Sequence, residues 1–493
     1  MRTTVRESVE VSPGESPVIG RTRSGASLAV LALLLALIGA LVRQGATEPA
    51  GRWLLGLGLA SFAATVAATV ARAGRGDGRP WTLRPRRPGG AAATTAVALA
   101  LAGWMLLVGR HHGTIAAAAA PVALLTALLV IWHGVARLAT TDRAALREGL
   151  ELIGVVIAGL TWAGFVLRRA PWAATGRGLW RADGPLTYAN ATAAVLALTV
   201  ALMITAGSDT AGLMPPRLRR PAGAVVLAAL AATLSRGGLL ALAVVVVVVA
   251  ALAGRRPVAS VAAMAGGGAV IELGLLPSVR ADSLARPVPA VASLVLGVGL
   301  AMLLDGRTAD PGHDRPGRRA HLPVAAGWLA VVGLLVAAAS LLGARLTLDS
   351  SHRRDAAVAA WRAVLRSPWF GTGPSAPQVH WHNASGASVT LAHVHDEYLQ
   401  VLLQYGVPAG VLLLILLVAV GRQLSAARPA PADPRRLGWA GCVAAGSAFA
   451  VHSGLDFLWH LPAVACYAVA VMALTQPPSP TGPGGVQERT VSP

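Results

Sequence analysis

The sequence predicts an all-α polytopic membrane protein with about 14 transmembrane helices and one long extracytoplasmic loop. Three observations predict this class. The chain of 493 residues is 55% hydrophobic, and apolar blocks recur along its whole length. Only 13% of the residues are charged, whereas about 25% is usual for a soluble protein. The composition therefore indicates one membrane domain and excludes a string of soluble domains.

The apolar blocks give the spans in chain order, because a crossing helix needs roughly 20 mostly apolar residues. The seventh and eighth blocks are short and meet at the letters TLSRGG. Together they are too long for one ordinary crossing, so we predict two helices there. The predicted spans are residues 26–42, 53–71, 92–108, 114–136, 149–167, 186–206, 221–235, 237–253, 258–277, 288–304, 322–343, 398–420, 437–454 and 458–475.

The basic residues give the orientation. The net charge is +20, and a basic balance can indicate nucleic-acid binding. Here the arginines lie in short loops between apolar blocks, so the positive-inside rule explains them better. If residues 1–25 are cytoplasmic and the spans alternate, most of the arginines fall inside. We therefore predict a multi-pass protein of the cytoplasmic (inner) membrane, with membrane lipids and no nucleic acid as partners.

The two ends of the chain are polar. Residues 1–25 lack the pattern of a cleaved signal peptide, so we expect a retained cytoplasmic segment. Residues 476–493 are rich in Pro, Gly and Ser, which is typical of a disordered tail, here also cytoplasmic. Residues 26–475 form the membrane domain. The two cysteines, Cys442 and Cys466, lie in separate apolar blocks, which favours packing over a disulfide or a metal site.

The alternation places two features on the same, extracytoplasmic face. One is the SRGG turn at residues 235–238, and the other is the long loop 344–397. Long loops held by a rigid scaffold often carry functional groups. Inside this loop, residues 353–366 have helical spacing, with Ala357, Trp361, Val364 and Leu365 on one apolar face, and a Ser-Pro pair ends the helix. We expect this amphipathic helix to lie on the outer surface.

Arginines on this face are candidate anion-binding residues. Arg236 lies where two apolar blocks meet, and a guanidinium beside lipid normally faces a partner or a polar cavity. One interpretation is a phosphate clamp, because the guanidinium fork matches phosphoryl oxygens. The alternative is a helix-end arginine whose charge reaches the lipid headgroups. Arg353 and Arg354 allow a second anion contact, or form a solvated pair.

The densest ionisable cluster is HVHDE at residues 393–397. His393 and His395 are candidates for general-base work, because histidine titrates near neutral pH. Alternatively the cluster is a polar helix entry, with Asp396 as the N-cap of the next span. Zinc is a third interpretation, because HWH at residues 380–382 adds a second histidine pair. No carboxylate or cysteine completes a familiar zinc spacing, so we predict no metal.

Four polar residues lie at the outer ends of other spans, and three of them, Tyr188, Asn190 and Asp456, are candidate supporting residues. Tyr188 and Asn190 open the sixth span, where a tyrosine is ordinary at a membrane interface. Asn190 either caps this helix or contacts a sugar. Asp456 and His460 lie in the last outer turn, where they either line a cavity or cap a helix.

Together these residues resemble the bacterial O-antigen ligase/polymerase family, which consists of polytopic glycosyltransferases using polyprenyl-diphosphate-linked glycans. The resemblance rests on HVHDEYLQVLLQYGVPAG at the end of the long loop, on SRG at residues 235–237, and on an arginine-led helix followed by PWFGTG. YANATA and HSGLDF look like weaker signatures, and the resemblance covers residues 184–464. The chain departs from the family pattern at Asp396, where the family has Asn, and at Gln404, where Glu is common.

The resemblance implies a fold similar to the GT-C-like O-antigen ligase fold and a metal-independent transfer without a cofactor. A glycan would leave its polyprenyl diphosphate carrier at the outer face of the membrane for a hydroxyl of a glycan, lipid or protein acceptor. Arg236, with Arg353 or Arg354, would hold the diphosphate, on which negative charge gathers in the transition state. His395 would orient or deprotonate the acceptor, supported by His393, Asp396, Tyr188, Asn190 and Asp456.

Two alternatives stay beside this interpretation. The same site can join lipid-linked repeat units of a cell-surface polysaccharide, which is a polymerase reaction. A non-enzymatic transporter of polysaccharide or lipid would instead bind near the bilayer midplane, with broken helices and internal repeats. The sequence shows no such repeat, and its ionisable groups gather at the outer ends of the spans.

Overall fold

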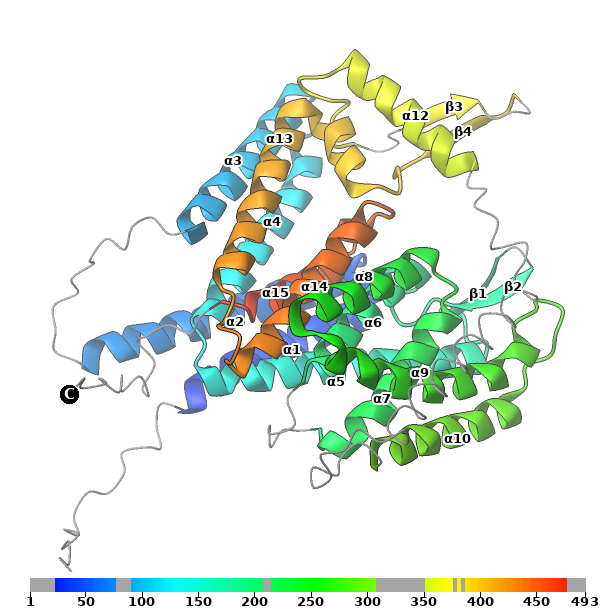
Figure 1. Cartoon of the computed structure of the whole chain (residues 1–493). Coiled ribbons are helices and arrows are strands. Elements are labelled where there is room, and N and C mark those ends of the chain that lie inside the picture. The colour runs from blue at the N-terminus through cyan, green and yellow to red at the C-terminus, as the bar shows by residue number, and fades with distance from the viewer. Residues whose placement is uncertain are drawn as a thin grey trace, which may run out of the picture.

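The computed structural model describes residues 23–76, 90–176, 178–206, 214–306, 351–375, 379–382 and 386–476. In these ranges the chain is a bundle of α-helices with two small β-hairpins (Figure 1). The helices are α1 (Arg23–Val42), α2 (Pro49–Gly76), α3 (Gly90–His111), α4 (Ile115–Ala136), α5 (Thr140–Val166), α6 (Ala189–Ile204), α7 (Pro216–Ala232), α8 (Arg236–Ala253), α9 (Arg255–Leu275), α10 (Pro287–Gly306), α12 (Ser351–Arg366), α13 (Glu397–Ala426), α14 (Arg435–Ser453) and α15 (Pro462–Ala473). Three short 3-10 helices are η1 (Gln44–Ala46), η2 (Leu276–Ser278) and η4 (Leu458–His460).

Each predicted span within the described ranges overlaps one of these helices. Eight of the described helices are long and apolar enough to cross a membrane, and they are α2, α3, α4, α5, α8, α9, α10 and α13. Three shorter apolar helices accompany them, in α1, α6 and α15. The protein is therefore a polytopic helical membrane protein. The total of about 14 crossings stays a prediction, and the span predicted at residues 322–343 lies outside the described residues.

One boundary agrees with the apolar blocks, and another differs from them. α7 and α8 are separate helices, as predicted, and Leu234 between them has a φ of 51°, a left-handed conformation that interrupts a helix. α5 begins nine residues before the predicted start at residue 149. Its first turns carry buried charged residues, including Arg143 and Glu151. These charged side chains are paired within the protein, which lets them be buried. A search for apolar residues alone therefore misses the start of α5.

The ends of the helices form two groups, one at each end of the bundle. We call them the His395 end and the Glu151 end. At the His395 end, Arg353 near the start of α12 donates to the carbonyl of Leu455 after α14. At the Glu151 end, Arg143 of α5 donates to the carbonyl of Leu474 after α15. This separation is the one that alternating crossings produce.

α6 is the central helix of the bundle, and nearly all of its side chains are buried. It packs against α5, α7, α8 and α14. Small residues permit this close packing, since a Cβ added at Gly154 of α5 would lie 2.0 Å from the Oγ1 of Thr199 in α6. Membrane helices commonly associate through small residues in this way. The segment just before α6 is therefore held firmly in the middle of the His395 end.

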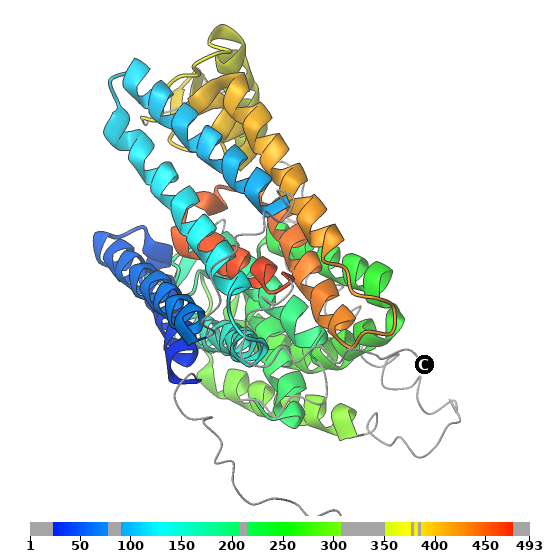
Figure 2. The ribbon, with the colours of Figure 1, turned by 90° about the vertical axis from the view of Figure 1, so that its left-hand side faces the viewer.

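α3, α4 and α13 form a group of long helices that extends away from the rest of the bundle (Figures 1 and 2). α12 lies across the end of α13, next to a hairpin of β3 (Val379–His382) and β4 (Ser388–Leu391). The other hairpin, β1 (Ala173–Gly176) and β2 (Leu179–Ala182), joins α5 to α6. Both hairpins are antiparallel, and they pair Ala173 with Ala182 and Val379 with Leu391.

α12 is the predicted surface helix, and it has two apolar faces. Ala360 and Val364 are buried against α13 and β3, in a cluster that includes Leu403. Trp361 and Leu365 are exposed on the outer side. The structure therefore divides the single apolar face that the spacing predicted, because Val364 packs inward while Trp361 and Leu365 stay exposed. The buried face fixes the rotation of the helix.

α13 is broken at Gly406, and the segment after α12 docks into this break. Gly406 has a φ of 77°, and a Cβ there would lie 2.2 Å from the carbonyl oxygen of Trp369. The amide of Val407 donates to the carbonyl of Pro368 at 2.7 Å, and segment 371–373 donates two further backbone hydrogen bonds to α13. Only glycine suits this conformation and this close approach. The PWFGTG motif (368–373) and the QYGVPAG motif (404–410) thus pack directly against each other.

Candidate functional site

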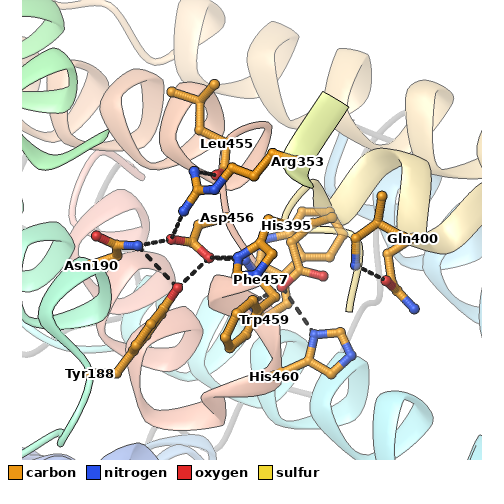
Figure 3. Close-up of polar contacts among 12 residues, drawn as sticks. Tyr188, Asn190, Arg353, His395, Gln400, Leu455, Asp456, Phe457, Trp459 and His460 are labelled. Carbon is orange, nitrogen blue, oxygen red and sulfur yellow. Dashed lines mark hydrogen bonds and ion pairs between the residues drawn. The ribbon is translucent and has the colours of Figure 1, made fainter. Parts of the chain in front are cut away.

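Asp456 is the centre of a buried polar network at the His395 end (Figure 3). Its Oδ1 accepts a hydrogen bond from the hydroxyl of Tyr188 at 2.6 Å and lies 3.0 Å from Nδ1 of His395. The side-chain amide of Asn190 donates to Oδ2 of Asp456 and to the hydroxyl of Tyr188. Segments before α6, before α13 and after α14 therefore meet at one carboxylate.

The backbone at this meeting point is held in uncommon conformations. His395 has a φ of 59° and Thr187, next to Tyr188, has a φ of 54°. Non-glycine residues rarely adopt positive φ, and such residues cluster at functional sites where the surrounding structure fixes them. The amide of Phe457 also donates to Oδ1 of Asp456 at 2.9 Å. This hydrogen bond fixes the orientation of the carboxylate. The network is held in place by the surrounding loops.

The electrostatics of the network keep Asp456 ionised. Burial raises the pKa of its carboxyl, but hydrogen bonds from His395 and Tyr188 outweigh burial, and the net pKa of Asp456 is lowered. Burial and the nearby Asp456 charge raise the pKa of Tyr188, so this phenol stays a neutral donor. A carboxylate facing Nδ1 of His395 makes that nitrogen the donor and leaves Nε2 as the acceptor. Nε2 of His395 is thereby left able to accept a proton.

Arg353 reaches this network from α12 (Figure 3). Its Nη1 donates to the carbonyl of Leu455 at 3.1 Å, and its Nη2 lies 3.9 Å from Oδ2 of Asp456. The guanidinium is partly exposed, so it can also contact a ligand. Arg354, the next residue, is exposed and has no recorded contact with the network among the described residues. The structure therefore places Arg353, rather than Arg354, beside Asp456.

The SRG turn is connected to the same region through a buried histidine. Ser235 caps α8 by accepting the amide of Gly238 at 3.0 Å, and Arg236 is exposed as the first residue of the helix. A Cβ added at Gly237 would lie 2.6 Å from Nε2 of His452. His452 is buried four residues before Asp456. The glycine of the motif thus lets the helix bearing Arg236 pack closely onto the helix that leads to Asp456.

Sequence reasoning missed Arg181, which lies in β2. Its Nη2 donates to the side-chain oxygen of Asn190 at 3.4 Å, and its Nε donates to the carbonyl of Thr233 at 3.3 Å. Asp183 lies 3.8 Å from the same guanidinium. Arg181 therefore joins the Asp456 network to the residues just before the SRG turn. Arg181 lies only nine residues before Asn190, in the predicted outer loop that precedes the sixth span. This proximity in the sequence is the observation that would have identified it.

His393 is a neutral member of the aromatic group around Phe457. Its ring stacks on Phe457 at 4.9 Å, and Tyr188 stacks on Phe457 at 4.8 Å. Burial, followed by the nearby charges of His460 and His395, lowers the pKa of His393 to about 4. The imidazole therefore carries no charge near neutral pH. Its contribution to the site is packing around Phe457.

Asp396 performs the alternative role considered for it, as a helix cap. Its Oδ1 accepts the amides of Tyr398 at 3.0 Å and Leu399 at 3.1 Å. Burial raises its pKa in spite of these hydrogen bonds. Its recorded hydrogen bonds begin α13 and do not reach Asp456. The replacement of the family's Asn by Asp keeps an N-cap residue at this position.

The histidines considered for zinc do not form a ligand set in the described ranges. His380 and His382 are exposed on β3, and His380 bonds through Nδ1 to the hydroxyl of Thr390 at 2.9 Å. No group of three His, Cys, Asp or Glu side chains suited to a metal ion occurs among the described residues. Cys442 and Cys466 are buried and free.

The fold and this network define a polytopic membrane protein with an oriented imidazole and arginines gathered at one end of its helices. Residues 221–414 match the family model described as O-antigen ligase. This part of the chain is therefore similar to the O-antigen ligase family, as the motifs predicted. No curated protein matches the chain. The matched segment contains Arg236, Arg353 and His395, and its network is completed by Asp456 and the segment before α6, which lie outside the match.

Proposed function

We propose that this protein transfers a glycan from a polyprenyl diphosphate carrier to an acceptor hydroxyl, as an O-antigen ligase-like glycosyltransferase. The family supports a ligase-type or polymerase-type glycosyltransferase acting on lipid-linked glycans. The observation that carries the proposal is the contact of His395 with buried Asp456, next to Arg353. This arrangement provides an oriented base and a cation in one place.

The proposed reaction uses these groups as follows. Nε2 of His395 takes the proton of the acceptor hydroxyl while the hydroxyl oxygen bonds to the anomeric carbon of the glycan. The bond from that carbon to the diphosphate oxygen breaks, and its electron pair leaves with the diphosphate. Asp456 stabilises the imidazolium that forms. Charge-assisted contacts of this kind act most strongly where charge develops.

The arginines are the proposed partners of the leaving group. Arg353 is anchored through Nη1 to a backbone carbonyl, which fixes its position while part of the guanidinium stays exposed. Arg236 is the first residue of α8, directly before the Gly237 that packs against His452, and it is exposed. Fixed guanidinium groups match phosphoryl oxygens and cost little reorganisation during the reaction. We propose that they neutralise the diphosphate without a metal ion or a cofactor.

The proposed place of the reaction is the outer face of the cytoplasmic membrane. The arginine distribution of the sequence supports a cytoplasmic location for the Glu151 end, and the His395 end then lies outside. A polyprenyl carrier confines its diphosphate to the membrane surface, where these residues would meet it. A polymerase that joins lipid-linked repeat units would use the same groups, with a second lipid-linked glycan as the acceptor.

The test is transfer by the purified protein in lipid nanodiscs, supplied with a polyprenyl-diphosphate glycan and an acceptor glycan or lipid. We expect release of the polyprenyl diphosphate only when acceptor is present, and no inhibition by EDTA. His395→Gln should lower the rate by about a hundredfold or more, because the base is lost. His380→Gln is the matched control and should keep the wild-type rate. A wild-type rate in His395→Gln would contradict the proposal.

A further inference from the structure

A second carboxylate–imidazole pair lies beside the first. Oε1 of Glu397 lies 3.3 Å from Nδ1 of His460, and the same oxygen accepts the backbone amide of Trp459. The side chain of Glu397 is 2% exposed, whereas that of His460 is 31% exposed. A buried carboxylate thus orients an imidazole that reaches the surface. This is the arrangement already described for Asp456 and His395.

The two pairs share one aromatic neighbourhood. The ring of His393 lies 4.1 Å from that of His460 and 4.9 Å from that of Phe457. The ring of His395 also lies 4.9 Å from Phe457. Figure 3 shows His395, Phe457 and His460 in one close group. A sugar bound at His395 would therefore have His460 within the neighbouring part of the site.

Structural support alone does not account for His460. The amide of Trp459 already ties the η4 turn to the start of α13 through Glu397, and this tie uses no imidazole. With Nδ1 directed at Glu397, the Nε2 of His460 has no hydrogen bond within the described residues. A carboxylate that fixes one ring nitrogen prepares the other nitrogen to bind a partner.

We propose that His460, positioned by Glu397, binds a second hydroxyl of the acceptor, next to the hydroxyl that His395 deprotonates. The inference rests on the proposed function and adds the acceptor subsite to it. The ligand class is a polyhydroxylated sugar, because sugar hydroxyls both donate to and accept from an imidazole nitrogen. Glu397 acts only through His460 and is a positioning residue.

The test is steady-state kinetics of the nanodisc-reconstituted protein with the acceptor concentration varied. His460→Gln should raise the acceptor KM about tenfold, which corresponds to one hydrogen bond. The kcat should stay within about threefold and the donor KM should be unchanged, because His395 and the arginines are intact. Glu397→Gln should raise the acceptor KM by a smaller factor. His380→Gln, on β3, should match the wild type.

Acceptor analogues sharpen the test. Monodeoxy acceptors are compared with the parent acceptor, using wild type and His460→Gln. One deoxy analogue should have a raised KM with the wild type and no further rise with the variant. An unchanged acceptor KM in His460→Gln, or an equal loss for every analogue, overturns the subsite while the proposed transfer stands. Absence of release by the wild type overturns the proposed function, and the subsite with it.

Discussion

The two ends of the helical bundle each contain a buried carboxylate, and they differ in the partners of that carboxylate. Asp456 is 1% exposed, and its partners His395 and Arg353 are 24% and 42% exposed. Glu151 is also 1% exposed, but its partners Arg147 and Arg219 are only 18% and 8% exposed. The first carboxylate is connected to the surface, and the second is enclosed.

The arginines at the Glu151 end use their donors within the protein. Arg147 donates to the carbonyl of Leu202 at 2.6 Å, and Arg143 donates to the carbonyl of Leu474 at 2.6 Å. Both carbonyls lie at the ends of helices, where backbone acceptors lack helical partners. These contacts hold α5 against α6 and α15. A buried ion pair therefore does not mark a functional site, and partners that titrate and reach the surface are the better indication.

The largest expected effect separates the two carboxylates. Asp456→Asn should lower glycan transfer by about a thousandfold, because an amide cannot stabilise the imidazolium or fix the same His395 tautomer. Glu151→Gln should lower thermal stability, because Arg147 and Arg219 lose their buried counter-charge. The transfer rate per folded molecule should stay near that of the wild type. Transfer assays and thermal melts of the same nanodisc preparations measure both effects.

The reverse pattern would break the comparison. If Glu151→Gln abolished transfer at normal stability, the enclosed network would have a direct role in the reaction. If Asp456→Asn merely unfolded the protein, the connected network would be structural.

A smaller expected effect distinguishes two adjacent arginines. Arg353→Ala should lower transfer by about a hundredfold, as the loss of one group that stabilises developing charge commonly does. Arg354→Ala should stay within about threefold, because this side chain is exposed and makes no contact with Asp456 among the described residues. Equal effects of the two substitutions on the transfer rate would show that α12 has no fixed rotation during the reaction.

Gly237→Ala tests the packing that connects the SRG turn to the Asp456 end. The new methyl would meet Nε2 of His452 at 2.6 Å, so the buried imidazole or the start of α8, with Arg236, must shift. We expect about a tenfold loss of transfer, since small displacements of positioning groups are costly. The double variant Gly237→Ala with His452→Ala should recover part of this loss. No recovery in the double variant would locate the effect elsewhere in the turn.

The smallest expected effect concerns acid stability. The pKa of His393 is lowered to about 4 by burial and by neighbouring charges, whereas an unfolded histidine titrates near 6.5. Between these two values the unfolded chain binds the proton and the folded protein does not, so stability falls as the pH falls. His393→Asn removes this group and should flatten the decline in melting temperature from pH 6.5 to pH 4.5. An unchanged decline would assign the acid sensitivity to other groups.

The sequence predicts the helices well, because the bilayer requires apolar blocks of a defined length. It also predicts Tyr188, Asn190 and Asp456, which are polar residues at the outer ends of apolar blocks. The Glu397–His460 pair was beyond it, since its role depends on a contact between distant segments. A hydrogen bond between Tyr188 and Asp456, for example, joins residues that no local pattern relates.

The choice between Arg353 and Arg354 shows the same limit on a smaller scale. α12 has two apolar faces, so its sequence allows two rotations. Docking of Ala360 and Val364 onto α13 selects one of them. Arg353 lies seven residues before Ala360 and therefore on the same side of the helix. Tertiary packing, rather than the motif, brings this arginine to the site.

Three backbone hydrogen bonds dock the segment after α12 onto α13 around Gly406. Arg353, near the start of α12, and His395, just before α13, are therefore carried by two helices that are packed onto each other. A side chain at residue 406 would clash with the carbonyl oxygen of Trp369 and would disturb the positions of the guanidinium and the imidazole together.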